Sequence, residues 1–396
     1  MLASTFPAGV DDGTPGFVRD LAVAESVEFD TTVLVPSLPG CPAQEWVGEV
    51  DVRRFRYFPR RWEDLADGAI LENVRRRRSR LLQVPALLTA EVFAVARAVR
   101  RLRPDVVHAH WIIPQGFAAL LAARGAPLLV TTLGGDVYGL TDPVSRLVIR
   151  RVLRRARHVT TMNTQMRQRL LDLGARPERT HVLPMGADVT AIRRAATGVE
   201  RVPNQLLFVG RLVEKKGLAV LLEAMPAVVA TRQVALRVVG DGPLRARLTD
   251  GARALPVRFV GAVAREQLAR EYAAASVVVA PSVAAASGDQ DGLPVALLEA
   301  LACGCAVVAS DLPGLRDVVT DGVNGLIVAP GDAAALAAAV ARLLDDAPLR
   351  ERLGAAAATT AEEYSVDALG ARYRALLHTT MDESPRRTRA RNEERT

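Results

Sequence analysis

Short apolar runs alternate with amphipathic stretches along the chain from about residue 30 onward. The apolar runs are rich in β-branched residues and are bounded by turn-forming residues, which is typical of buried parallel strands. They cover residues 32–35, 105–108, 128–131 and 158–161 in the first half, and residues 205–209, 235–239, 257–260, 276–280, 306–309 and 325–328 in the second half. Because strands and helical stretches alternate, we expect βαβ units and an α/β fold.

The alternation pauses over residues 184–205, where several Pro and Gly residues indicate a linker. We therefore predict two tandem Rossmann-like, doubly wound domains, one over residues 1–195 and one over residues 196–365. Residues 366–380 have a helical apolar pattern, and the polar, basic tail over residues 381–396 is predicted to be disordered. Sheets of this kind bind ligands at the carboxyl ends of their strands, so two facing domains place the expected site in the cleft between them.

The beginning of the chain is unusual for such a domain, whose first strand normally lies at the centre of the sheet. Only five residues precede the turn at Phe6 and Pro7. Either the sheet is built on a very short strand, or the start codon is assigned too late. These residues lack the features of a secretory signal, and the apolar stretches fall short of the ~20 residues that span a bilayer. We expect a cytoplasmic protein without a transmembrane helix.

Composition fits a globular protein of about two domains, with 396 residues of which 49% are hydrophobic and 24% charged. Of the 51 Lys and Arg residues, 49 are Arg, and only Lys215 and Lys216 are Lys. Residues 1–200 hold 28 Arg against 21 acidic residues, which accounts for the formal net charge of +7. Such a field favours an anionic surface or substrate.

The cysteines do not indicate a disulfide framework. Cys303 and Cys305 flank a glycine, and no His or further Cys lies near them at the spacing of metal ligands. We interpret them as small buried thiols.

A first candidate site follows the predicted strand 205–209. Gly210, Arg211 and Lys216 lie at its carboxyl end, in a loop that opens a helix. A guanidinium, an ammonium and a helix N-terminus together suit a phosphate group. The alternative is a solvated basic turn.

A second candidate site precedes the strand 306–309. Pro294 suits the first turn of a helix and Gly304 its end, so the amides of Gly292 and Leu293 are expected to form an anion site. Asp291 lies just before this helix.

Glu299 lies inside the helix predicted between Pro294 and Gly304. The carboxylates of Glu299 and Asp291 are suited to accept hydrogen bonds from sugar hydroxyls. A capping role for Asp291 is the alternative.

These segments occur within a longer series of motifs. The series comprises Phe6–Pro7, Gly13–Val18, Val107–Trp111, Gly134–Val137, Leu183–Asp188, Gly210–Gly217, Val239–Pro243, Phe259–Gly261, Ala280–Ser282, Asp291–Glu299 and Asp321–Gly325. Their order and spacing over residues 1–380 resemble those of the retaining family-4 glycosyltransferases, which have the GT-B fold.

The resemblance implies an enzyme of the hexosyltransferase type that moves a sugar from a nucleotide diphosphate donor to an acceptor hydroxyl. By the family pattern, Arg211 and Lys216 hold the donor diphosphate, Asp291 contacts the donor sugar, and Glu299 binds the ribose. The backbone of residues 292–294 lies near the phosphates.

The resemblance also implies that the first domain binds the acceptor, that the second binds the nucleotide sugar, and that the helix over residues 366–380 crosses back to the first domain. The remaining family positions border the donor site. Gly261 lies beside the base. Asp136 joins Arg211, Lys216 and Asp291 as a candidate catalytic residue, and Gly16 and His110 are first-domain candidates for donor binding. His110 ends a strand, where a packed or hydrogen-bonded role is the alternative.

Two positions depart from the family pattern. Leu133 stands where a His is frequent near the donor sugar, and Asp291 replaces the more common Glu. Both changes bear on donor choice or on activity.

The implied mechanism places negative charge on the departing diphosphate, which Arg211 and Lys216 stabilise. The departing phosphate oxygen takes the acceptor proton, so no side-chain base is required. Asp289 and Asp291 spell a motif that holds a metal in another glycosyltransferase fold, but their position before a second-domain helix argues against that role. We expect no metal and no cofactor besides the donor.

Other functions are disfavoured. No G-x-G-x-x-G follows a strand, which argues against a dinucleotide oxidoreductase, and no Lys is left for a pyridoxal phosphate Schiff base. A nucleotide-sugar epimerase of related fold and a catalytically silent scaffold remain as alternatives.

The expected acceptor is lipid-linked, a saccharide or a small molecule, as in cell-envelope polysaccharide, glycolipid or glycoconjugate biosynthesis. The Arg run over residues 75–80 borders the apolar residues 81–88, which is compatible with peripheral docking on an anionic membrane. A buried helix with a solvated Arg end is the alternative. Aromatic residues are not interleaved with the Arg runs, so nucleic acid is not an expected partner.

Overall fold

The structure is a computed structural model that describes residues 1–7, 16–67, 70, 73–74, 77–140 and 142–382. The chain forms two compact units. Among the described residues, unit 1 comprises those within 1–162, 166–185 and 369–382, and unit 2 comprises those within 163–165 and 186–368.

Unit 2 is built on a six-stranded parallel sheet. Its strands are β8 (Gln205–Val209), β9 (Ala235–Val239), β10 (Val257–Gly261), β11 (Val277–Ala280), β12 (Ala306–Ser310) and β13 (Leu326–Val328). They are arranged in the order β10-β9-β8-β11-β12-β13. The strand order therefore reverses between β8 and β11, and such a switch point is where open α/β sheets bind ligands.

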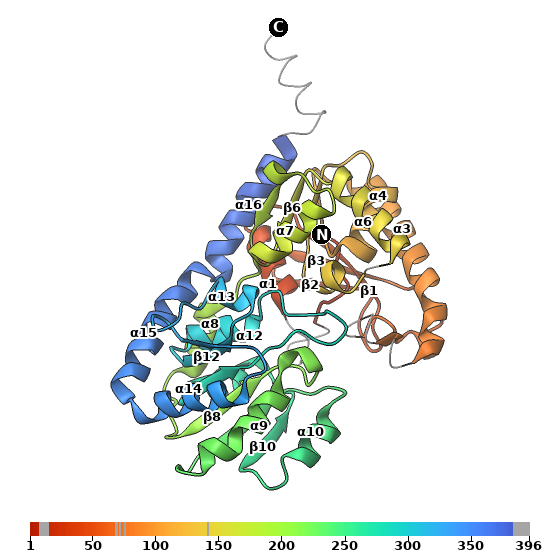
Figure 1. Ribbon diagram of the computed structural model, residues 1–396. Coiled ribbons are helices and arrows are strands. Elements are labelled where there is room, and N and C mark those ends of the chain that lie inside the picture. The colour runs from red at the N-terminus through yellow and green to blue at the C-terminus, as the bar shows by residue number, and fades with distance from the viewer. Residues whose placement is uncertain (8–15, 68–69, 71–72, 75–76, 141, 383–396) are drawn as a thin grey trace. The chain divides into compact units, whose positions relative to one another are not determined.

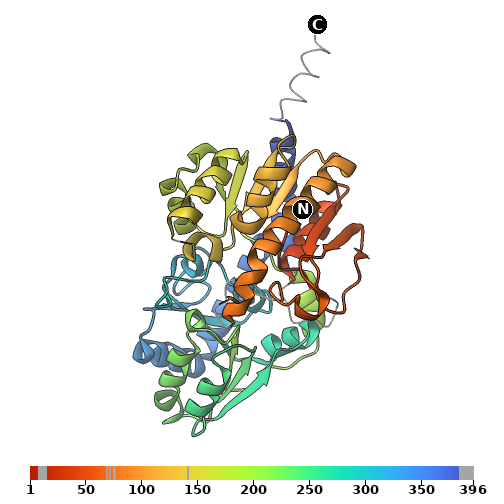
Figure 2. The ribbon, with the colours of Figure 1, turned by 90° about the vertical axis from the view of Figure 1, so that its right-hand side faces the viewer.

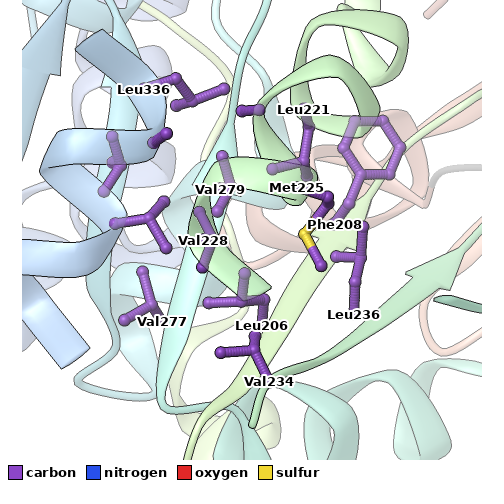
Figure 3. Packing of buried hydrophobic residues seen from close by; sticks show 14 of the residues in the cluster. Leu206, Phe208, Leu221, Met225, Val228, Val234, Leu236, Val277, Val279 and Leu336 are labelled. Carbon is purple, nitrogen blue, oxygen red and sulfur yellow. The ribbon is translucent and has the colours of Figure 1, made fainter. Parts of the chain in front are cut away.

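The helices of unit 2 cover both faces of this sheet. They are α8 (Val189–Ala196), α9 (Leu218–Val229), α10 (Arg245–Gly251), α11 (Arg265–Ala274), α12 (Val295–Ala302), α13 (Pro313–Arg316), α14 (Ala333–Asp345) and α15 (Ala347–Glu363), with the 3₁₀ turn η5 (Glu214–Lys216). Alternate residues of β8 point to opposite faces, so Leu206 and Phe208 pack with α9 and α14, whereas Leu207 packs with α8, α11 and α12 (Figures 1 and 3). The sheet is thus buried between two apolar cores, which is why its strands read as continuous apolar runs.

Unit 1 has a second parallel sheet with one antiparallel edge strand. Its strands are β1 (Thr32–Pro36), β2 (Gln44–Val47), β3 (Val50–Phe55), β4 (Val107–His110), β5 (Leu128–Thr131), β6 (His158–Thr161) and β7 (Thr180–Val182). They form a β1-β3-β2 group and a β4-β5-β6-β7 group. Leu2 pairs in parallel with Leu34 on one side and Ala109 on the other, so a very short extended segment joins the two groups at the centre.

The helices of unit 1 include the longest one in the described part of the chain. They are α1 (Phe17–Ser26), α3 (Gln83–Leu102), α4 (Phe117–Ala122), α5 (Gly135–Tyr138), α6 (Pro143–Arg155) and α7 (Thr164–Asp172), with the short turns η1 (Arg60–Trp62), η2 (Arg78–Leu82), η3 (Ile112–Gly116) and η4 (Pro177–Arg179). Helix α7 belongs to unit 1 from Met166 onward. Helix α16 (Val366–Asp382) begins in unit 2, and from Leu369 onward it belongs to unit 1.

Several boundaries differ from the sequence expectation. The stretch 184–205 is not an irregular linker, because Asp188 accepts a hydrogen bond from the amide of Ala191 and so caps helix α8. Helix α8 packs within unit 2, which begins at residue 186 rather than 196. The eight-residue length of α8 explains the error, since such a short helix shows little periodicity.

The two ends of the predicted pattern also shift. Strand β4 runs two residues further than the predicted 105–108 and includes His110. Met381 and Asp382, which we placed in the tail, belong to α16, and Met381 is buried. The predicted disorder of residues 383–396 lies outside the described residues.

One described helical segment, Arg78–Leu102, is long and apolar enough to cross a membrane by length and composition. Its α3 portion buries Gln83, Leu87, Glu91 and Val95. Because α3 packs against β1, β3 and α4, it belongs to the layer of helices that covers the sheet of unit 1.

Candidate functional site

The basic loop after β8 is held close to the end of β11. Gly217 adopts a left-handed conformation with φ of +67°, and a Cβ atom at this position would lie 1.7 Å from the carbonyl oxygen of Pro281. Only glycine fits this approach. The neighbouring Val283 amide donates a 2.9 Å hydrogen bond to the carbonyl of Lys215. The turn thereby fixes Lys216 beside the segment that follows β11.

Asp291 is the acidic partner of this loop. Its Oδ2 atom lies 2.9 Å from the ammonium of Lys216 and accepts a 2.9 Å hydrogen bond from Ser282 Oγ. Asp291 is buried, with 7% of its surface exposed. Burial by itself favours the protonated carboxyl, but the charges of Lys216 and Lys215 and the bonds from Lys216 and Ser282 hold its pKa below the ordinary value. The site therefore holds a buried carboxylate next to a half-buried cation.

The adjacent residues tie the two loops together on the solvent side. Lys215 contacts Asp289 at 3.1 Å, and its ammonium lies 4.0 Å from Asp291 Oδ1. The carboxylate of Glu214 accepts a 3.0 Å hydrogen bond from the amide of Ala286. Both acidic residues of the Asp289-x-Asp291 pattern thus face lysine ammonium groups.

The glycines at the ends of β8, β9 and β10 lie side by side. The amide of Gly210 bonds to the carbonyl of Val239, and the amide of Gly240 bonds to the carbonyl of Gly261. A Cβ atom on Gly240 would lie 2.0 Å from the carbonyl oxygen of Gly210. The structure therefore brings the predicted Gly210 and Gly261 to one edge of the sheet.

The segment before α12 is shaped by close backbone contacts. Asn163 Nδ2 donates a 2.6 Å hydrogen bond to the carbonyl of Gly292, and a Cβ atom on Gly314 would lie 1.5 Å from the same oxygen. Pro294 occupies the N-cap position of α12 rather than its first turn, and no side chain caps this helix. The alternative capping role for Asp291 is therefore wrong, and its carboxylate faces the lysines instead. Leu293 lies between these residues and is half-buried.

Glu299 and Arg211 complete the predicted donor set in unit 2. Glu299 Oε2 accepts a 3.1 Å hydrogen bond from the hydroxyl of Tyr272, whose pKa is raised well above its ordinary value by burial and by the charge of Glu299. Arg211 is exposed at the end of β8. The predicted residues Gly210, Arg211, Lys216, Gly261, Asp291, Gly292, Leu293, Pro294 and Glu299 thus all belong to loops or helix starts at the carboxyl end of one sheet, apart from Glu299, which lies within α12.

In unit 1, the carboxylate of Asp136 accepts hydrogen bonds from backbone amides of the loops that follow β4 and β5. Its Oδ2 atom accepts a 2.9 Å hydrogen bond from the amide of Ile112, and its Oδ1 atom accepts 3.1 Å bonds from the amides of Leu133 and Gly134. Burial raises the pKa of Asp136, and these amide bonds oppose the shift. These hydrogen bonds show that Asp136 positions the loop around Leu133. A catalytic role for Asp136 stays a prediction.

The two histidines of β4 are buried. His108 contacts Glu25 Oε1 at 2.8 Å and Thr131 Oγ1 at 2.7 Å, so the hydrogen-bonded role is the one seen. His110 is fully buried, and burial lowers its pKa well below the ordinary value. Gly16 lies at the N-cap position of α1.

Three residues of the site were not singled out from the sequence. Ser282 was noticed only as part of a motif, Tyr272 reads as a core aromatic, and Asn163 lies 129 residues before its partner Gly292 in the sequence. Position after a strand end was the available signal for Ser282 and Asn163, which follow β11 and β6.

The fold and site define a two-unit α/β protein whose second unit presents paired cations and a carboxylate at the switch point of a Rossmann-like sheet. Residues 17–186 match the glycosyl transferase 4-like domain, and residues 203–346 match glycosyl transferases group 1. The D-inositol 3-phosphate glycosyltransferase of Frankia alni is 34% identical over 310 residues, which span 69% of this chain and 74% of that protein. The chain therefore belongs to the group 1 glycosyltransferase family.

Other relatives match over a smaller share of their length. The amylovoran biosynthesis glycosyltransferase AmsK of Erwinia amylovora is 35% identical over 182 residues, or 44% of each chain. The chain thus spans about half the length of the first curated relatives it matches.

Solved structures confirm the expected GT-B fold. Sucrose-phosphate synthase from Thermosynechococcus elongatus matches with a TM-score of 0.76 at 22% identity, covering 96% of this chain and 97% of that one. Anabaena Alr3699/HepE, in complex with UDP and glucose, matches with a TM-score of 0.70 at 19% identity, covering 93% and 97%.

Proposed function

We propose that the protein is a retaining glycosyltransferase that moves a sugar from a nucleotide diphosphate sugar to an acceptor hydroxyl. The observation that carries this proposal is the contact between half-buried Lys216 and buried Asp291 at the switch point between β8 and β11. In this proposal, as in the family pattern expected from the sequence, Lys216 binds the diphosphate and Asp291 contacts the donor sugar. A 2.9 Å contact between the two groups fits a ligand in which phosphate and sugar are directly joined.

In this mechanism, Arg211 and Lys216 bind the diphosphate and stabilise the charge that develops on it as the sugar–phosphate bond breaks. The amides of Gly292 and Leu293 lie next to the same phosphates, and Glu299 accepts hydrogen bonds from the ribose. The departing phosphate oxygen takes the proton of the acceptor hydroxyl. The new bond forms on the face from which the diphosphate leaves, so the anomeric configuration is retained.

The donor proposal is supported by the solved structure of HepE with UDP and glucose, which has a similar fold. The AmsK relative supports an acceptor in polysaccharide biosynthesis, and a lipid-linked, saccharide or small-molecule acceptor fits the Arg-rich first half of the chain. The cytoplasmic location and the absence of a metal requirement stay predictions.

The decisive experiment is a thermal-shift screen of the full chain with UDP-, GDP-, ADP- and dTDP-linked sugars. One nucleotide sugar is expected to raise the Tm, because a ligand that binds only the folded state stabilises it. The donor that raises the Tm is then incubated with a panel of acceptors, and the anomeric configuration of the product is read by NMR.

A second measurement separates the alternatives. The same donor is incubated alone, with and without excess chelator. Slow release of free sugar that persists in chelator supports transfer chemistry, whereas a changed sugar with no acceptor indicates an epimerase. A strict manganese dependence, or no response to any nucleotide sugar, would overturn the proposal.

A further inference from the structure

Three helices of unit 1 form one outer layer. Helices α3, α4 and α6 follow β3, β4 and β5, and right-handed crossovers place such successive helices on the same face of a parallel sheet. Helix α3 packs against α4, and α4 packs against α6 (Figures 1 and 2). We name the outward side of this layer the α3–α4–α6 surface.

The surface exposes large apolar side chains. Over η2, α3, α4 and α6 these are Leu81, Leu82, Phe93, Leu102, Leu121, Val144 and Leu147. The exposed fractions are 76% for Leu82, 69% for Phe93 and 71% for Val144. Single exposed apolar residues are ordinary on a protein surface, but a gathering on one layer of helices marks an interaction site.

Helix α3 separates a buried face from an apolar outward face. Gln83, Leu87, Glu91 and Val95 are buried at four-residue spacing. At 100° per residue, Leu82, Phe93 and Arg100 lie on the opposite side of the helix. The outward positions between Leu82 and Ala96 carry no charge.

Basic residues surround this apolar strip. The exposed arginines of α3 and α6 are Arg97, Arg100, Arg101, Arg146, Arg150, Arg151 and Arg154, and Arg77 and Arg78 precede α3. Within α3, α4 and α6 the single acidic residue is Glu91, which is buried. The surface therefore presents apolar side chains with positive charge, and the exposed carboxylate of Asp142 caps the start of α6 at its border.

We propose that the α3–α4–α6 surface docks on an anionic lipid bilayer, with α3 lying in the plane of the interface. The uncharged strip from Leu82 to Ala96 is about 20 Å long, and with arginines at both ends it matches acyl chains below and anionic headgroups around it. A protein partner would have to supply a long apolar groove lined with acids. This surface includes and extends the membrane-docking segment over residues 75–88 that the sequence led us to expect. Residues 75 and 76 of that segment lie outside the described residues.

The proposal does not depend on glycosyl transfer, so its test is a binding measurement. The full chain is sedimented with vesicles of phosphatidylcholine alone and of phosphatidylcholine mixed with phosphatidylglycerol. Binding is expected only to the mixed vesicles and is expected to weaken as salt is raised.

Paired variants test the two parts of the surface. The double variant Arg100→Gln/Arg101→Gln is expected to weaken binding about 25-fold, since each basic residue at the headgroups contributes about fivefold. Phe93→Gln is expected to weaken binding about tenfold or more because it removes an exposed ring that the bilayer would bury.

Matched controls lie in unit 2. Arg247→Gln/Arg253→Gln removes two exposed arginines, and Val323→Gln removes one exposed apolar side chain. Both controls are expected to bind the mixed vesicles as the unchanged protein does.

The proposal fails if binding to neutral and mixed vesicles is equal, or if the unit 2 controls lose as much binding as the unit 1 variants. It also fails if folded Phe93→Gln and Arg100→Gln/Arg101→Gln proteins bind normally. A single-stranded oligonucleotide that binds the same arginines in preference to vesicles would assign the surface to nucleic acid instead.

Discussion

The ammonium of Lys216 lies 2.9 Å from the Oδ2 atom of Asp291, and this contact joins the loops that follow β8 and β11. The two residues come from positions 75 residues apart in the sequence. Burial of the carboxylate makes the pair stronger than a surface ion pair, because solvent does not screen it. A diphosphate bound at Lys216 would therefore share the ammonium with the carboxylate of Asp291, whose position is already fixed.

Loss of the Lys216 ammonium is expected to abolish most of the transfer activity. Lys216→Ala removes a fixed charge partner of the departing diphosphate, which corresponds to about 10²–10³ in rate. The measurement is kcat with a saturating donor, and circular dichroism checks that the fold is intact.

Lys215→Ala is the matched control for this change. Lys215 contacts Asp289 in a partly exposed pair, so its loss is expected to change the rate by less than about fivefold. Equal losses in the two variants would contradict the assignment of the diphosphate to Lys216.

The ionisation of Asp291 predicts how stability depends on pH. Because the pKa of Asp291 is depressed in the folded protein, its contribution is present above the ordinary value of 3.8 and is lost as the pH falls through the folded pKa. The unfolding free energy of the unchanged protein should exceed that of Asp291→Asn by a constant amount at neutral pH. This difference should shrink below about pH 4.

Urea unfolding of the two proteins across pH measures this difference. Asp289→Asn, at the outer pair with Lys215, is the control and is expected to follow the unchanged protein more closely. A difference that grows as the solution becomes more acidic would contradict the Lys216–Asp291 pairing.

The close approach at Gly217 predicts a steric effect. Gly217→Ala places a Cβ atom 1.7 Å from the carbonyl of Pro281 at a positive φ, so the unfolding free energy should fall by about 2 kcal/mol or more. The donor-induced rise in Tm should be lost with it.

Gly251→Ala serves as the comparison for this steric effect. Gly251 ends α10 and has open space around its Cβ position, so the change in stability should stay within about 1 kcal/mol. If Gly217→Ala is tolerated equally well, the fixed turn before α9 is not needed to position Lys216.

The strands of unit 2 could be predicted from the sequence because both faces of the sheet are buried. The run 205–209 coincides with β8, and the run 235–239 coincides with β9. The partners of these buried side chains could not be predicted, because an apolar run does not indicate which helix covers it. The short helix α8 was missed because Asp188 and the tertiary contacts, rather than a long periodic pattern, stabilise it.

For the candidate site too, individual residues could be predicted from the sequence, whereas the contacts between them could not. Lys216, Asp291 and Glu299 could be predicted because each follows a strand end or occupies a recognisable motif. The Lys216–Asp291 contact could not be predicted, because it depends on the strand order that places β11 beside β8. Asp136 carries the same lesson, since a sequence motif does not reveal that three backbone amides occupy its carboxylate.

A buried hydrogen-bond chain in unit 1 provides the last prediction. Glu25 contacts His108, whose other nitrogen contacts Thr131; Thr131 contacts Thr160, and Thr160 lies 3.3 Å from the hydroxyl of Tyr373. Burial raises the pKa of Glu25 to about 8 and lowers the pKa of His108 to about 3, so both side chains are neutral at pH 7. The chain thus joins α1, three strands and α16 without a buried net charge.

The unfolding free energy of the unchanged protein is expected to fall as the pH rises, and Glu25→Gln is expected to remove this fall. The folded protein keeps the Glu25 proton after the unfolded chain has lost it, so stability falls from about pH 4.5 to about pH 8 and then levels off. Relative to the unchanged protein, Glu25→Gln should gain stability across this window in urea unfolding. Glu28→Gln is the control of opposite sign, because hydrogen bonds from His378 and Arg374 lower the pKa of the exposed Glu28. Parallel pH profiles for Glu25→Gln and the unchanged protein would show that Glu25 is already ionised in the folded state.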